Sequence, residues 1–170
     1  FGCQTAHALA DFQASKGFIE TGTVTQETWS KLMHCAEPSI FDRCLQVTAS
    51  FEGTGFTEVI GNFDGQGLTW GIIGFTLANG ELGAVLAEVA GEYPDLLHSA
   101  FGGEVDEILY ISGPETTKAD KIAWGDSVSR GENRYHVAEP WKTYFREFGS
   151  LREVQKTQIR RARLKYWSRA

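Results

Sequence analysis

Two carboxylates stand on either side of a glycine-rich turn, and their types and spacing suit acid–base hydrolysis. Glu52 follows an apolar-faced segment, whereas Asp64 lies within the turn at residues 61–67. Apolar surroundings raise the pKa of a carboxyl group, while a hydrated turn leaves one ionised. Glu52 is therefore the candidate general acid and Asp64 the candidate general base. The hydroxyl of Thr69, just after the turn, can orient the attacking water.

The elements around this pair are predicted to be mainly helical, in a mainly α (α+β) domain. A helix over 40–52 has Ser39 as its N-cap and Asp42 in a capping-box position, and it ends at Glu52. Helical spacing predicts a core-facing side formed by Ile40, Phe41, Cys44, Leu45, Thr48 and Phe51. The same spacing predicts further helices over 81–93, 141–148 and 150–167. Residues 68–75 form either a short strand or the start of a buried helix.

Residues 1–35 are predicted to form a separate small helical module, joined by residues 36–39 to a larger domain over 39–170. Thr5 and Thr25 are the expected N-caps of its two helices. The module contains FG-x-x-T, AL-x-x-FQ, a glycine before a phenylalanine, and G-x-V-x-x-x-T-W-x-x-L. In these motifs it resembles the second half of a type 1 peptidoglycan-binding domain, which implies that it holds an enzyme on the cell wall. A generic pair of short helices is the alternative.

The segment with the two carboxylates has the pattern E-x(n)-G-x-x-D-G-x-G-x-T-x-G-I-x-G-F. This pattern resembles the catalytic segment of family 46 chitosanases and of related lysozyme-like peptidoglycan hydrolases. The resemblance implies a lysozyme-like domain of two lobes and inverting hydrolysis, with Glu52 as acid, Asp64 as base and Thr69 placing the water. Gln66 stands where the chitosanases have an arginine, and the segment between acid and base is shorter here. Both departures favour the peptidoglycan-acting relatives.

The expected function is cleavage of β-1,4 glycosidic bonds in peptidoglycan, without a metal or an organic cofactor. One alternative is a chitosanase, because an acidic protein suits cationic chitosan. Another is a wall-binding protein without catalysis, since a carboxylate beside an Asp-Gly turn is common in proteins that are not enzymes. If the enzyme inverts, the carboxyl groups of Glu52 and Asp64 lie about 6.5–9.5 Å apart across one cleft. The expected partner is peptidoglycan or a related amino-sugar polysaccharide, bound by a monomer, with neither nucleic acid nor membrane.

Five further residues are candidates for contacts with the glycan, namely Gln66, Trp70, Asn79, Gln155 and Arg160. A tryptophan can stack on a sugar ring, although large aromatic residues more often belong to a core. The amides can bind hydroxyl or acetamido groups, or can simply be polar surface. Arg160 and Arg161 are candidates for gripping the carboxylates of the peptide stem.

Charge is distributed unevenly along this chain of formal net charge −6. Residues 39–140 carry 5 basic and 16 acidic groups, whereas residues 141–170 carry 9 and 2. The basic tail is predicted to be one solvated helix, with a cationic face for an anionic polymer as the alternative.

The three cysteines are predicted to be buried thiols, or else Cys3 and Cys35 form a disulfide in an oxidising compartment. They form no C-x-x-C pair with zinc-ligand spacing. No apolar run approaches the roughly 20 residues that cross a bilayer, and no signal peptide is visible. The chain opens at Phe1 without a methionine, so we expect a fragment, truncated at its C-terminus, of an extracellular, periplasmic or phage-delivered wall hydrolase such as an endolysin.

Overall fold

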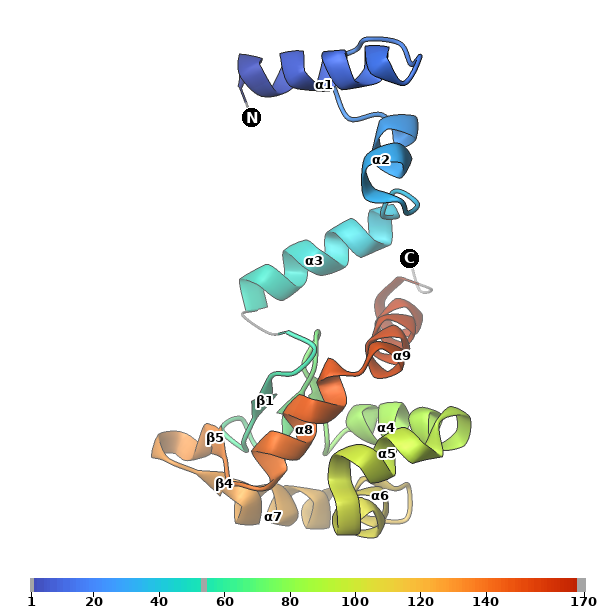
Figure 1. The fold of residues 1–170 in the computed structure, drawn as a ribbon. Helices are drawn as coiled ribbons and strands as arrows, with labels where there is room; N and C mark the ends of the chain where they lie inside the picture. Colours follow the sequence, from blue (N-terminus) through green and yellow to red (C-terminus); the bar gives the residue numbers. More distant parts are fainter. Residues whose placement is uncertain (1, 53–54, 168–170) are drawn as a thin grey trace. The chain divides into compact units, whose positions relative to one another are not determined.

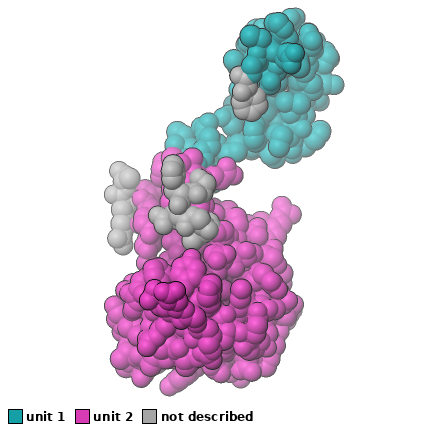
Figure 2. All heavy atoms as spheres, turned by 90° about the vertical axis from the view of Figure 1, so that its left-hand side faces the viewer, with its two compact units in different colours: residues 1–43 teal, residues 44–170 magenta. Residues whose placement is uncertain are grey.

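The structure, a computed structural model, describes residues 2–52 and 55–167, apart from the side chains of residues 50–52. It is mainly helical, as the sequence predicts. The chain divides into two compact units, residues 1–43 and 44–170 (Figure 1, Figure 2). This division falls inside helix α3 (Ile40–Glu52), beyond the predicted linker at 36–39. The helix begins with the predicted capping box, in which the Ser39 backbone N–H donates to Asp42 Oδ2 at 3.0 Å.

Unit 1 consists of α1 (Cys3–Ser15), α2 (Gln26–Met33) and the first turn of α3. Thr25 caps α2 as predicted, because its hydroxyl accepts a hydrogen bond of 3.2 Å from a backbone N–H in the first turn. The other predicted cap is wrong. Helix α1 begins before Thr5 with Gly2 as its N-cap, and the carbonyl of Gly2 accepts from the Thr5 backbone at 3.0 Å.

Gln13 is the polar centre of unit 1, and its side chain is fully buried. Its Nε2 donates to the Thr23 carbonyl at 2.8 Å and to Thr28 Oγ1 at 3.0 Å. Its Oε1 accepts from the backbone N–H groups of Thr21 at 2.9 Å and Gly22 at 3.0 Å. One amide therefore joins α1, the following loop and α2, which gives the glutamine of the AL-x-x-FQ motif a structural role.

The core-facing side of α3 is narrower than its sequence pattern predicts. Phe41 and Leu45 are buried. Three of the other predicted positions are exposed, namely Ile40, Cys44 and Thr48. The side chain of Phe51 lies outside the described residues. Because residues four apart lie in one line along a helix, the buried part is a single ridge.

All three cysteines are exposed free thiols: Cys3, Cys35 and Cys44. Both predicted arrangements, buried thiols and a disulfide between Cys3 and Cys35, are therefore wrong for this structure. Cys44 immediately precedes the buried Leu45 and so lies off the buried ridge of α3.

Unit 2 contains a three-stranded antiparallel sheet in the order β1 (Val59–Ile60), β2 (Thr69–Trp70) and β3 (Phe75–Thr76). Of the two alternatives for residues 68–75, the structure has the strand, followed by a turn and a second strand. Directly paired residues share a face of a sheet. One face is buried and consists of Val59, Trp70 and Phe75. The opposite face is half-exposed and consists of Ile60, Thr69 and Thr76.

The rest of unit 2 is mostly helical (Figure 1). Its helices are α4 (Glu81–Glu92), α5 (Pro94–Phe101), α6 (Val105–Ser112), α7 (Lys118–Val128), α8 (Trp141–Ser150) and α9 (Arg152–Ala162). Short helical turns cover Gly102–Glu104, Glu132–Arg134 and Arg163–Trp167. A small hairpin, β4 (Ser129–Arg130) with β5 (His136–Val137), follows α7.

The core of unit 2 combines the apolar side of α4 with a cluster of aromatic rings. Of the five apolar positions that helical spacing predicts in α4, Ala90 is half-buried and the other four are fully buried, namely Leu82, Val85, Leu86 and Val89. Trp70 lies against Phe148, with ring centroids 5.5 Å apart, and its Nε1 donates to the Phe145 carbonyl at 3.1 Å. The buried face of the three-stranded sheet is thereby fastened to α8, which leaves the Thr69 face toward the surface.

Candidate functional site

The turn that contains Asp64 is fastened to α7 by Asn62, which is buried, with an exposed fraction of only 7%. Asn62 Oδ1 accepts from the Gly67 backbone N–H at 2.7 Å, and this bond closes the turn. Asn62 Nδ2 donates to Asp126 Oδ1 on α7 at 2.5 Å. Asp64 itself is exposed, and its Oδ1 accepts from the Gln66 backbone N–H at 3.0 Å. A rigid turn therefore presents the Asp64 carboxylate to solvent.

Asp126 is the second carboxylate near this turn, and it has structural partners. The hydrogen bond from Asn62 and the ion pair with Arg134 lower the pKa of Asp126, against a smaller opposing effect of burial. The carboxylate of Asp126 therefore binds Asn62 and Arg134, and through Asn62 it stabilises the contact between the turn and α7. Asp64 makes no such ion pair among the described residues, which leaves its carboxylate accessible for chemistry.

The glycines of the turn allow backbone to pack directly on backbone. Gly67 has φ +80°, and a Cβ there would lie 2.9 Å from the Lys121 carbonyl oxygen of α7. A Cβ on Gly125 of α7 would in turn overlap the backbone of Gly67. The glycine density that predicts a turn is therefore also what lets this turn lie flat on α7.

Thr69 has a buried hydroxyl on the half-exposed face of the sheet. Its Oγ1 is inaccessible to solvent and has no hydrogen-bond partner among the described residues. A side chain at Gly74 would crowd the Thr69 methyl group, at 3.1 Å, so this close approach requires a glycine. A buried hydroxyl without a partner costs free energy, and such sites in folded proteins call for an explanation. Because this Oγ1 is closed to solvent, it can hold a water or a substrate group only after its surroundings move.

Glu52 is the last residue of α3, as the sequence predicts, but its side chain lies outside the described residues. The predicted distance between its carboxyl group and that of Asp64 stays a prediction. Along the chain, α3 leads into β1, whose Ile60 pairs directly with Thr69.

The structure brings two predicted substrate-binding residues together next to the turn. Asn79 Nδ2 donates to Gln66 Oε1 at 2.8 Å and to Thr76 Oγ1 at 3.0 Å. Lys118, at the start of α7, donates to Asn79 Oδ1 at 3.4 Å. No motif in the sequence points to Thr76 or Lys118, and only the alternation of side chains along β3 could have placed Thr76 on the Thr69 face.

Three other predicted substrate contacts have structural partners instead. Trp70 is fully buried, so its ring belongs to the core and cannot stack on a sugar. Gln155 Nε2 donates to the Gly149 carbonyl at 3.0 Å and closes the junction of α8 and α9. Arg160 pairs with Glu88 and Glu92 of α4, and these partners raise its pKa.

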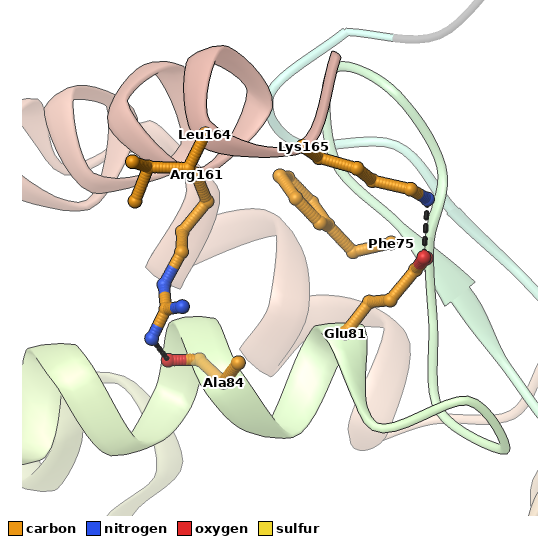
Figure 3. A pocket seen from close by; sticks show the side chains of 6 residues that line it. All are labelled: Phe75, Glu81, Ala84, Arg161, Leu164 and Lys165. Carbon is orange, nitrogen blue, oxygen red and sulfur yellow. Dashed lines mark hydrogen bonds and ion pairs between the residues drawn. The ribbon is translucent and has the colours of Figure 1, made fainter. Parts of the chain in front are cut away.

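The basic tail is bound to α4 by further ion pairs around a pocket of about 350 Å³ (Figure 3). The pocket is lined by Phe75, Glu81, Ala84, Arg161, Leu164 and Lys165. Arg161 donates to the Ala84 carbonyl at 3.1 Å and pairs with Glu88, while Lys165 pairs with Glu81. Burial lowers the pKa of Lys165, but its hydrogen bonds with Glu81 and Tyr166 raise it overall. Three cations of the tail that were predicted to face solvent or an anionic polymer, Arg160, Arg161 and Lys165, are therefore paired within the chain.

Among the residues that the structure describes, no group of three or more His, Cys, Asp or Glu side chains is placed to hold a metal ion. Within the same residues, no helix has the length and apolar character needed to cross a membrane.

Comparison of the chain with protein-family models, with curated proteins and with solved structures finds no match. The resemblances noted in the sequence therefore stay predictions, and the function is inferred from the residues of the site.

Proposed function

We propose that this protein is a glycoside hydrolase that cleaves β-1,4 bonds of peptidoglycan by an inverting mechanism. Glu52 protonates the leaving oxygen, Asp64 accepts a proton from water, and Thr69 holds that water. The observation that carries the proposal is the exposed Asp64 carboxylate on a turn that Asn62 fastens to α7, with Thr69 on the sheet face that follows. Peptidoglycan is preferred to chitosan because Glu81, Glu88 and Glu92 are neutralised by the basic tail, which weakens the charge argument for a cationic substrate.

The substitution Thr69→Val tests whether the Thr69 hydroxyl places the attacking water or only stabilises the fold. Valine has the same shape, so the substitution removes a buried hydroxyl that has no described partner and should leave the free energy of unfolding unchanged or slightly higher. If the hydroxyl holds water, the release of reducing ends from purified peptidoglycan should nevertheless fall by about tenfold or more, since one positioning hydrogen bond is lost. Equal activity in Thr69→Val and wild type would remove Thr69 from the mechanism.

The carboxylates are tested with Glu52→Gln and Asp64→Asn on peptidoglycan and, in parallel, on chitosan. Loss of a general acid or base should lower the rate by about 10²–10⁴-fold. Asp106→Asn is the matched control, because Asp106 is an exposed aspartate on α6. Release from chitosan alone would move the substrate to that polymer. If the protein binds the cell wall but releases no reducing ends from either polymer, the alternative of a wall-binding protein without catalysis is favoured.

A further inference from the structure

Two exposed aromatic rings lie against each other: that of Phe63, the residue before Asp64 in the sequence, and that of Tyr135 in the β4–β5 hairpin. Phe63 is 50% exposed and Tyr135 is 45% exposed. Their ring centroids are 5.6 Å apart and their planes are tilted by 56°. Single exposed apolar side chains are common on soluble proteins, whereas apolar side chains that are exposed side by side mark candidate binding surfaces.

Backbone hydrogen bonds fix the two segments that carry the rings. The Gly61 N–H donates to the Tyr135 carbonyl at 2.9 Å, and the Phe63 N–H donates to the Gly61 carbonyl at 2.9 Å. A Cβ at Gly61 would lie 2.8 Å from the carbonyl oxygen of His136, so the two segments approach too closely for any other residue. The His136 ring stands perpendicular to that of Tyr135, with centroids 5.5 Å apart. The pair is therefore preorganised for a ligand.

The backbone before Tyr135 is strained. Asn133 and Arg134 have φ of 53° and 57°, a left-handed conformation that asparagine adopts readily but arginine only at a cost. Arg134 also pairs with Asp126, the residue that anchors the Asp64 turn through Asn62. A strained loop that fixes an exposed ring is explained by binding better than by stability. The ion pair between Arg134 and Asp126 also neutralises both of these charges, which lie close to the rings in the structure.

We propose that Phe63 and Tyr135 form a stacking platform for a sugar ring of a neutral amino-sugar chain that runs past Asp64. This inference rests on the proposed function and adds a substrate-binding site to it. The flat faces of the rings match the C–H face of a pyranose, and large rigid rings supply contact area with little loss of conformational freedom. Because Phe63 adjoins Asp64 in the chain, a sugar held on the platform lies next to the candidate base.

The test uses the full chain with Asp64→Asn, so that binding is measured without hydrolysis. Phe63→Leu and Tyr135→Leu keep apolar bulk but remove the flat ring, while Tyr135→Phe keeps the ring. The matched control is Tyr110→Leu, since Tyr110 on α6 is 73% exposed. The probe is the tetramer of N-acetylglucosamine, with the cationic tetramer of glucosamine as its charged counterpart, and the dissociation constant is measured by titration calorimetry.

Each leucine variant should raise the dissociation constant for the neutral tetramer by about tenfold, as expected for an aromatic hot spot. Tyr135→Phe and Tyr110→Leu should bind as the parent does. With Asp64 restored, the leucine variants should raise KM for peptidoglycan fragments and leave kcat unchanged. Unchanged affinity in both leucine variants, failure of the parent to bind, or preference for the cationic tetramer would overturn the platform.

The platform and the proposed function fail in different ways. Tetramer binding that depends on both rings, in a protein that releases no reducing ends, would retain the platform and remove the hydrolase. Hydrolysis that is indifferent to both rings would retain the hydrolase and remove the platform. A concentration-dependent dimer that Phe63→Leu and Tyr135→Leu abolish would assign the rings to a protein contact and overturn the glycan proposal.

Discussion

Asn62→Ala should destabilise unit 2 strongly, because one small side chain connects the Asp64 turn to α7. The substitution leaves the buried N–H of Gly67 without its acceptor, which costs about 1–3 kcal/mol. It also removes the donor to the charged Asp126, a bond worth about 1.5–3 kcal/mol in general. Asp126 keeps Arg134, and its side chain is 33% exposed, so the lower end applies there. We expect a loss of about 3–4 kcal/mol in the free energy of unfolding at pH 7.

The pH dependence of this loss checks its cause. The pKa of Asp126 is lowered in the folded protein, with Asn62 as the largest cause. A lowered carboxylate pKa stabilises the fold above the unfolded pKa, and this stabilisation disappears as the pH falls through the folded value. In Asn62→Ala the pKa returns toward its ordinary value, so the difference between variant and wild type should shrink as the pH falls below about 4.

Urea unfolding of the full chain at pH 7 and at pH 3 measures both effects. Hydrogen exchange at the Gly67 amide should also become faster in Asn62→Ala. A loss below about 1 kcal/mol at pH 7 would mean that the turn finds other partners. An equal loss at both pH values would refute the link through Asp126.

Three further predictions concern other parts of the chain. Gln13→Leu should make the amides of Thr21 and Gly22 exchange faster and should destabilise unit 1 by about 2–4 kcal/mol, because four hydrogen bonds of a buried side chain are lost. Hydrogen exchange of the full chain measures both effects. Gly83→Ala should lower the midpoint of thermal unfolding, because a Cβ there overlaps the Ser112 carbonyl oxygen and overpacking costs about 1–3 kcal/mol. All three thiols should react with a thiol reagent in the folded protein at the rate of exposed cysteines, without denaturant.

Local patterns in the sequence predict the elements that local chemistry determines. The apolar spacing of α4, the cap of α2 at Thr25 and the capping box at Ser39 and Asp42 all occur as predicted. Each of these depends on residues within one or two helical turns, so the sequence shows the whole interaction.

Contacts between distant residues could not be predicted in the same way. Asn62 and Asp126 are far apart in the chain, and so are Arg160 and Glu88, and no local pattern specifies either pairing. The segregation of charge was visible in the sequence, yet only the packing of the tail on α4 shows that the two signs meet. Trp70 was ambiguous for the same reason, since a ring that stacks on sugar and a ring that fills a core have the same residue type.

The residues of the glycine-rich motif differ in how well packing accounts for them. Gly67 and Gly71 have positive φ and no space for a side chain, against α7 and against Gln158 respectively. Stability alone explains these glycines, and a protein without catalytic activity would need them as much as an enzyme. Packing explains neither the exposed Asp64 nor the buried, unpartnered hydroxyl of Thr69. Departures from local physical rules are expected at functional sites. The activity of Thr69→Val, compared with its stability, is therefore the observation that best separates a hydrolase from a protein that only shares its turn.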